Sequence, residues 1–213
     1  MSMDPAQLAP CLDQLLSEMS PPTELIDANA RANLLTWLTL VEQWNRKLDL
    51  TAARTTQELV DLLVADAVRL ASMATAGSSW IDVGTGCGAP GMGLALLRPD
   101  IAMTLVEPLE KRVTFLRTVI GTLRRTDIKI VRGKGEDIAA KQETFDVAVS
   151  RATLNPPEWL ALGDQLAPKG EVLVLLARVD TPTHSARKLV EEVSYTWPLT
   201  RADRRIARFM PTT

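Results

Sequence analysis

A glycine-rich segment is the part of this sequence whose residue types are best suited to chemistry. Its glycines follow an acid, Asp82, and stand at Gly84, Gly86, Gly88 and Gly91. The residues before the turn, 80–83, are mostly apolar and predict a strand, and residues 91–98 have a helical composition. A strand, a glycine turn and a helix in this order bring backbone N–H groups and a helix N-terminus close to a ligand. Glycine suits such a turn because a side chain would block that approach.

Two cofactor classes use this geometry, and the residue before the turn separates them. Gly86, Gly88 and Gly91 fit the G-x-G-x-x-G pattern of dinucleotide sites. An acid two residues before Gly-x-Gly-x-Gly fits better, because a carboxylate repels a pyrophosphate but attracts the ammonium and sulfonium groups of S-adenosylmethionine. The alternative is a tight structural turn without a ligand. We expect S-adenosylmethionine to bind at these residues: Asp82, Gly84, Thr85, Gly86 and Gly88.

Further acids follow the next two predicted strands. Residues 101–107 read as a strand that ends in Glu107, 19 positions after Gly88, the distance at which such an acid meets ribose hydroxyls. NAD enzymes share this feature, so Glu107 does not discriminate between the cofactors, and an ordinary surface glutamate is its alternative. Glu136 and Asp137 follow the third predicted strand. An acid there can accept a hydrogen bond from the exocyclic amine of adenine, and the alternative is a solvated turn residue.

The elements that must position these residues alternate regularly between strand and helix. Strands are predicted at residues 80–83, 101–107, 128–131, 145–149 and 172–176. This rhythm predicts an α/β protein with a parallel sheet covered on both faces. In such a sheet ligands bind beyond the carboxyl ends of the strands. We therefore expect the acids named above and the Ser150-Arg151 pair to converge on one crevice.

Two regions are expected, a helical extension at residues 1–76 and a Rossmann-like core at residues 77–213. In the extension, Trp37 and Trp44 belong to a broad apolar helical face and are expected to pack in the core. A second helix there begins at Thr55, with Glu58 as the partner in a capping box. The core is expected to hold helices at 110–123, 156–166 and 187–193, and a closing pair of strands at 195–197 and 208–210.

The composition of the chain argues against a membrane protein, a secreted protein and a metal site. The chain has 213 residues, 46% of them hydrophobic, and no apolar run long enough to span a bilayer, so we expect no membrane partner. The N-terminus lacks a basic region and does not predict a signal peptide. Its two cysteines, Cys11 and Cys87, and its single histidine, His184, show no metal-ligand or nucleophile spacing. A cytoplasmic protein without a metal is the expectation.

Charge is unevenly distributed although the formal net charge is only −2. Residues 107–137 carry eight basic and five acidic side chains, and residues 201–208 carry four arginines and one acid. These stretches predict either local basic faces that contact phosphate or solvated helix surfaces.

Four motifs together resemble a known family. The chain is similar to the bacterial small-subunit ribosomal RNA guanine-N7 methyltransferases of the RsmG (GidB) type, over roughly residues 35–175. The motifs are Trp44-Asn45-x-x-Leu48-Asp49-Leu50-Thr51-Ala52, Ile81-Asp82-Val83-Gly84-Thr85-Gly86-x-Gly88-x-Pro90-Gly91, Lys111-Arg112-x-x-Phe115-Leu116-Arg117 and Phe145-Asp146-x-x-x-Ser150-Arg151-Ala152.

The resemblance implies a class I S-adenosylmethionine-dependent methyltransferase fold, with a seven-stranded sheet and added N-terminal helices. It implies S-adenosylmethionine at the glycine turn, at Glu107 and at the Glu136-Asp137 turn, and ribosomal RNA or the small ribosomal subunit as partner. Arg151 matches an arginine at the active-site mouth and is the expected catalytic residue.

Five residues, in three places, depart from the family's usual pattern. Leu62-Leu63 stand in place of Arg-His, Leu176-Ala177 in place of Lys-Gly, and Asp49 in place of Asn. The cofactor residues are retained, whereas polar groups suited to face RNA are replaced. A methyltransferase of the same fold with a small-molecule or protein substrate, and a non-catalytic binding protein on this scaffold, therefore stand beside the ribosomal RNA enzyme as alternatives.

Overall fold

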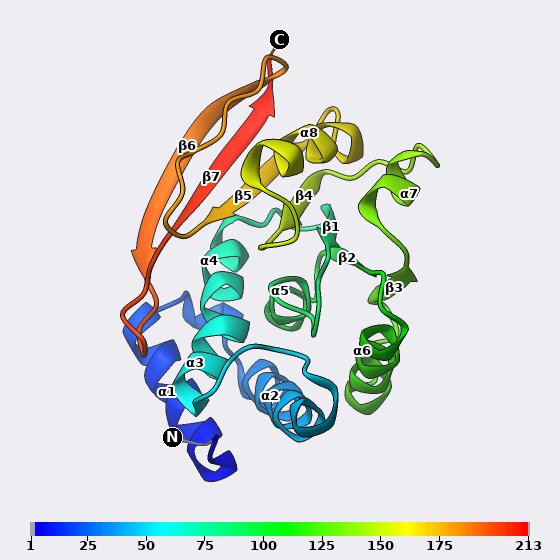
Figure 1. Ribbon diagram of the computed structural model, residues 1–213. Coiled ribbons are helices and arrows are strands. Elements are labelled where there is room, and N and C mark those ends of the chain that lie inside the picture. Colours follow the sequence, from blue (N-terminus) through cyan, green and yellow to red (C-terminus); the bar gives the residue numbers. More distant parts are fainter. Residues whose placement is uncertain (1–2, 213) are drawn as a thin grey trace.

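The computed structural model describes residues 3–212 as a seven-stranded sheet between two layers of helices (Figure 1). The strand order is β3-β2-β1-β4-β5-β7-β6. Strands β1 to β5 run parallel to one another, and β7 is antiparallel to both β5 and β6. The strands are β1 (Ser79–Val83), β2 (Ala102–Glu107), β3 (Lys129–Arg132), β4 (Val147–Ser150), β5 (Glu171–Leu176), β6 (Arg187–Thr196) and β7 (Asp203–Pro211).

The central strand β1 is buried on both faces, as expected for a parallel strand between helices. Trp80 belongs to the hydrophobic cluster on one face of the sheet, whereas Ile81 and Val83 belong to the cluster on the other face. Asp82 is therefore a carboxylate enclosed in an otherwise apolar strand, and the structure has to satisfy it locally.

The helices divide between the two faces of the sheet. Helices α4, α5 and α6 cover one face, with α1, α2 and α3 outside them, and α7 and α8 cover the other (Figure 1). The capping box predicted between Thr55 and Glu58 is confirmed at the start of α3. The helices are α1 (Leu8–Met19), α2 (Ala28–Leu48), α3 (Thr56–Val60), α4 (Asp66–Met73), α5 (Gly91–Leu97), α6 (Glu110–Leu123), α7 (Gly135–Ala139) and α8 (Pro156–Leu166).

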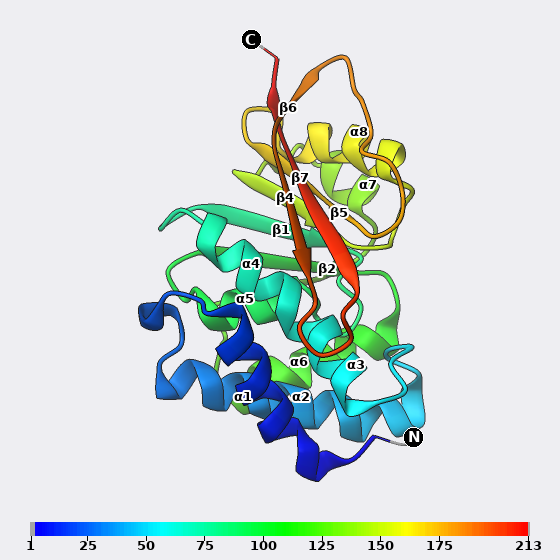
Figure 2. The ribbon, with the colours of Figure 1, turned by 90° about the vertical axis from the view of Figure 1, so that its left-hand side faces the viewer.

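A π-helical segment, Asp61–Ala65, joins α3 to α4. The turn of the β6–β7 hairpin packs against this segment. The buried Asp61 accepts hydrogen bonds from the backbone N–H groups of Leu199 and Thr200 and from the Thr200 hydroxyl. Figure 2 shows the hairpin extending along the side of the molecule until its turn lies beside α3. The N-terminal helices and the last strands of the sheet are thus held together.

The helix predicted at residues 187–193 is wrong, because this segment is the first part of β6. Leu189 and Val193 are four positions apart and imitate a helical face. Pairing with β7 over nine registered positions outweighs that weak local preference, and it leaves Leu189 and Val190 exposed at a β-bulge. The predicted strand character of 195–196 and 208–210 is confirmed, since these residues belong to the paired strands β6 and β7. Their predicted pairing with each other is wrong, because Tyr195 lies opposite Arg204 and Arg208 lies opposite Glu191.

Other predicted elements agree closely with the structure. The helices at 110–123 and 156–166 and the predicted packing of Trp37 in the core are confirmed. Residues on both sides of position 76 contribute to one hydrophobic cluster, so a division into extension and core at that point stays a proposal. Within residues 3–212, no helix is both long and apolar enough to cross a membrane.

Candidate functional site

The glycine turn between β1 and α5 is built around the buried Asp82. Its Oδ2 accepts hydrogen bonds from Thr85 Oγ1 at 2.6 Å and from the Gly91 N–H at 2.8 Å. Among the described residues, Oδ1 has no hydrogen-bond partner. Burial raises the pKa of Asp82 to about 6, although both hydrogen bonds oppose the shift. The structure thus places Asp82 beneath the turn, where it ties the two ends of the loop together.

Two glycines of the turn show why side chains are excluded there. A Cβ at Gly84 would lie 2.2 Å from Thr153 Oγ1, and the backbone of Gly84 has φ +69°. Gly86 has φ +63°, and a Cβ there would meet no atom within 4 Å. Gly84 is therefore fixed by packing against Thr153, whereas Gly86 borders open space that a ligand can fill.

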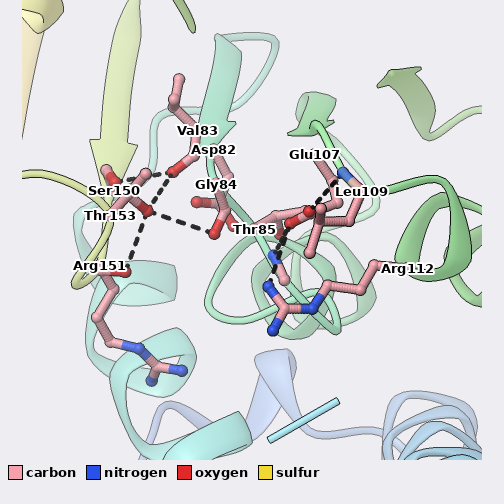
Figure 3. Close-up of polar contacts among 11 residues, drawn as sticks. Asp82, Val83, Gly84, Thr85, Glu107, Leu109, Arg112, Ser150, Arg151 and Thr153 are labelled. Atoms are coloured by element: carbon pink, nitrogen blue, oxygen red, sulfur yellow. Dashed lines mark hydrogen bonds and ion pairs between the residues drawn. The ribbon is translucent and has the colours of Figure 1, made fainter. Parts of the chain in front are cut away.

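Glu107 lies across the turn at the end of β2 and is buried. Its Oε2 accepts a hydrogen bond from the Gly86 N–H at 3.0 Å, and its Oε1 accepts one from the Leu109 N–H at 2.9 Å. The guanidinium of Arg112 approaches Oε2 to 3.9 Å (Figure 3). Glu107 is thus held in a fixed orientation beside the glycine turn.

These residues enclose a cleft of about 520 Å³ at the carboxyl ends of the strands. Gly84, Thr85, Gly86, Glu107 and Arg151 line it, so the structure brings these predicted site residues together. Asp82 and Gly88 do not line it and act on the turn from behind. The size and position suit a nucleoside-type cofactor, whose sugar hydroxyls Glu107 can bind.

Glu136 and Asp137 lie on α7, beside a smaller cavity of about 220 Å³. Glu136 lines this cavity, which shares Gly84 and Thr153 with the cleft. Asp137 does not line it, and its carboxylate accepts a hydrogen bond from the Lys134 N–H at 2.8 Å. Of the two acids, Glu136 is placed to meet a ligand and Asp137 stabilises the start of α7.

Arg151 follows β4 and points toward α4 (Figure 3). Its Nη1 donates hydrogen bonds to the Leu62 carbonyl and to Asp66 Oδ2, the latter at 3.0 Å. Asp66 is almost fully buried, and its Oδ1 also accepts hydrogen bonds from Tyr195 Oη and Trp197 Nε1, each at 2.7 Å. Burial and the Asp66 carboxylate raise the pKa of Tyr195, so its hydroxyl stays protonated and donates. One carboxylate thus orients Arg151 and two aromatic side chains.

A second cavity of about 310 Å³ lies on the other side of Arg151. Leu62, Arg151 and Ala152 line both this cavity and the cleft. Leu176 and Ala177 also line it. Leu62 and Leu176-Ala177, which depart from the family's usual residues, therefore line the same cavity.

Several residues of the site were not predicted from the sequence. Thr153 contacts the turn through hydrogen bonds from Oγ1 to the Val83 and Gly84 carbonyls, at 3.2 and 3.4 Å. Trp37, expected only to pack, also donates from Nε1 to the Cys87 carbonyl at 3.1 Å. Arg112 was visible only as part of the Lys-Arg motif. Thr153 and Trp37 make their contacts across 50 or more positions of the sequence, which local patterns do not report.

Cys87 belongs to the glycine turn, and its side chain is buried. Burial raises the pKa of Cys87 to about 11, so its thiol stays protonated near neutral pH. Within residues 3–212, no group of three or more His, Cys, Asp or Glu side chains is arranged to hold a metal ion.

The sheet order with one antiparallel strand, β7, is that of class I S-adenosylmethionine-dependent methyltransferases. The crystal structure of TrmN from Thermus thermophilus has a similar fold, with a TM-score of 0.55 and 18% sequence identity. That match covers 72% of this chain and 48% of the other. At this identity the likeness concerns the fold alone.

Two proteins named Ribosomal RNA small subunit methyltransferase G are similar to this chain in sequence. The protein from Clostridium botulinum (strain Loch Maree / Type A3) is 39% identical over 126 residues, 57% of this chain. The chain spans about half the length of the clostridial relatives it matches, 53% in this case. The protein from Anaeromyxobacter dehalogenans (strain 2CP-C) is 32% identical over 196 residues, which cover 86% of this chain and 90% of the relative. Residues 30–196 match the family described as GidB, rRNA small subunit methyltransferase G. The chain belongs to the rRNA small subunit methyltransferase G family.

Proposed function

We propose that this protein is an S-adenosylmethionine-dependent methyltransferase that methylates guanine N7 in small-subunit ribosomal RNA. The observation that carries the proposal is the cleft in which the glycine turn, Glu107 and Arg151 face one another at the carboxyl ends of the strands. Family membership supports the RNA substrate. We propose that the protein acts in the cytoplasm, because bacterial ribosomes are there.

The residues of the cleft fit the cofactor. Glu107 is oriented by two backbone N–H groups and is placed for ribose hydroxyls, while the open space at Gly86 admits a ligand close to the backbone. Glu136 lines the adjoining small cavity, and we expect it to accept a hydrogen bond from the adenine amine. Asp82 acts by fixing the turn through Thr85 and Gly91. S-adenosylmethionine, when bound, supplies an electrophilic methyl group.

The acceptor chemistry suits a site that lacks a strong base. Guanine N7 has a lone pair and carries no proton, so its methylation requires no proton abstraction. The chain's contribution is to hold the base in line with the methyl group, and orientation of this kind lowers barriers by about 7–11 kcal/mol. Arg151 stands between the cleft and the second cavity, with Nη1 fixed by Asp66, and is placed to orient the acceptor.

Calorimetric titration with S-adenosylhomocysteine tests the cofactor assignment, with NAD as control. We expect micromolar binding of S-adenosylhomocysteine and none of NAD. Transfer of labelled methyl groups to small ribosomal subunits that lack the modification, with transfer RNA as control, tests the acceptor. Binding without transfer to the subunits would overturn the RNA assignment in favour of a small-molecule or protein acceptor. Absence of binding would leave a non-catalytic member of the family.

A further inference from the structure

The indole of Trp37 reaches the glycine turn from the outer layer of helices. Trp37 lies on α2, which packs against α5 and α6 (Figure 1), and its side chain is fully buried. Its Nε1 donates a hydrogen bond to the Cys87 carbonyl at 3.1 Å, although 50 positions separate the two residues. Cys87 lines the cleft, so this bond joins an N-terminal helix to the wall of the cleft.

The ring of Trp37 also fits closely against two glycines, one before α5 and one within it. A Cβ at Gly88 would lie 3.2 Å from Trp37 Cζ2, and a Cβ at Gly93 would lie 3.2 Å from Trp37 Cζ3. In a close-packed interior, contacts this short leave no room for a side chain at either glycine unless the ring moves. The hydrogen bond and the ring contacts together fix the turn relative to α2.

The peptide unit between Cys87 and Gly88 is held at both ends. The Gly88 N–H donates a hydrogen bond to the Thr85 carbonyl at 2.9 Å, and the Cys87 carbonyl accepts the one from Trp37. Glycines stand on both sides of Cys87, with φ +63° at Gly86 and +109° at Gly88. Because glycine restricts the backbone little, the conformation of this stretch depends on the contacts that hold it from outside.

We propose that Trp37 is a positioning residue for the cofactor, an inference that rests on the proposed function. Its indole N–H keeps the Cys87–Gly88 peptide in the orientation that lets S-adenosylmethionine approach the backbone of the turn. A site that is already ordered loses less conformational entropy when its ligand binds, and therefore binds it more tightly. Asp82 and Glu107 hold the turn from the sheet, whereas Trp37 holds it from α2. Cofactor binding and the docking of α2 therefore stabilise each other.

Two matched variants test the role of the indole N–H. Trp37→Phe removes the donor to the turn. Trp159→Phe makes the same change at a buried tryptophan whose Nε1 donates to the Leu173 carbonyl at 2.9 Å and which lines neither the cleft nor the two neighbouring cavities. Both variants lose a hydrogen bond and core volume, so we expect both to unfold at a lower temperature than the wild type.

The affinity for S-adenosylhomocysteine should distinguish these two variants. Calorimetry at a temperature where circular dichroism shows both proteins folded should find the affinity about three- to tenfold lower in Trp37→Phe, because the turn has lost one hydrogen bond. The affinity of Trp159→Phe should equal that of the wild type. Equal affinities in the two variants would overturn the proposal.

The indole N–H signal of Trp37 provides a test in the wild-type protein, which needs no variant. In a proton–nitrogen correlation NMR spectrum this signal is assigned through its nuclear Overhauser contacts with Gly88. We expect it to shift on saturation with S-adenosylhomocysteine, and the indole signal of Trp159 to stay in place. An unchanged Trp37 signal would overturn the proposal and leave the proposed function intact. Failure of the wild-type protein to bind S-adenosylhomocysteine would instead contradict the proposed function.

Discussion

Arg151 Nη1 lies 3.0 Å from Asp66 Oδ2, although 85 positions separate the two residues. Asp66 belongs to the N-terminal helices, and Arg151 follows the fourth strand of the sheet. The same carboxylate holds Tyr195 and Trp197 at the end of the β6–β7 hairpin. One buried acid therefore connects three distant parts of the chain at the wall between the cleft and the second cavity.

Replacement of this acid should destabilise the fold strongly. Asp66→Ala leaves the buried Tyr195 hydroxyl and Trp197 indole N–H without their acceptor and removes the carboxylate from the partly buried Arg151. Loss of one partner of a buried pair costs about 3–5 kcal/mol. Urea unfolding followed by circular dichroism measures the loss. Asp13→Ala is the control, because the Asp13–Arg31 pair is largely exposed and such pairs contribute about 0–1 kcal/mol. Equal losses in the two variants would contradict the structural role of Asp66.

Arg151 should matter more for methyl transfer than for cofactor binding. Arg151→Ala removes the donors proposed to face the acceptor, and we expect kcat/KM for transfer to fall about 100-fold or more. The affinity for S-adenosylhomocysteine should change far less. Arg151→Lys keeps the charge without the planar fork and should restore only part of the activity. Equal losses of transfer and cofactor affinity would show that Arg151 serves the cofactor or the fold instead.

The raised pKa of Asp82 predicts a pH-dependent stability. In the folded protein the Asp82 carboxyl group keeps its proton up to about pH 6. In the unfolded chain it loses this proton near its ordinary pKa of 3.8. Asp82 therefore makes the fold less stable as pH rises from about 4 to about 6, by at most ~3 kcal/mol. Asp82→Asn has no proton to lose, so its stability relative to wild type should improve over that range.

Urea unfolding of both proteins between pH 4 and 7 measures the effect of Asp82. Asp100→Asn is the control, because the ion pair with Arg98 lowers the pKa of Asp100. The stability of that variant relative to wild type should stay nearly constant between pH 4 and 7, because both the folded and the unfolded protein have lost the Asp100 proton over most of that range. A flat difference between Asp82→Asn and wild type would contradict the burial of an ionised Asp82.

Glu107 should be required for cofactor binding. Glu107→Gln removes the negative charge that would accept ribose hydroxyls, and hydrogen bonds to charged groups contribute about 1.5–3 kcal/mol, so the affinity for S-adenosylhomocysteine should fall about 10- to 100-fold. Glu110→Gln, three positions along, affects only an exposed ion pair with Arg132 and should leave the affinity unchanged. Unchanged affinity in Glu107→Gln would exclude Glu107 from the cofactor site.

The sequence predicts most of the scaffold because strand, turn and helix signals are local. The glycine turn, the helix at Glu110–Leu123 and the capping box at Thr55 follow from neighbouring residues. The helix prediction at residues 187–193 is wrong because the spacing of the apolar residues there resembles a helix, and only pairing with β7 makes the segment a strand. The hydrogen-bond partners of Asp66 and the contact of Thr153 with Gly84 could not be predicted from local sequence patterns, because they join segments far apart in the chain.

The central claim is methylation of guanine N7 in small-subunit ribosomal RNA, and the position of the product methyl group tests it most directly. Small ribosomal subunits that lack the modification are incubated with the protein and S-adenosylmethionine. Borohydride reduction and aniline treatment then break the RNA chain at N7-methylguanosine. The account predicts a new cleavage at a guanine, present with the wild-type protein and strongly reduced with Arg151→Ala. Methyl incorporation without cleavage, or no incorporation by a protein that binds S-adenosylhomocysteine, would contradict it.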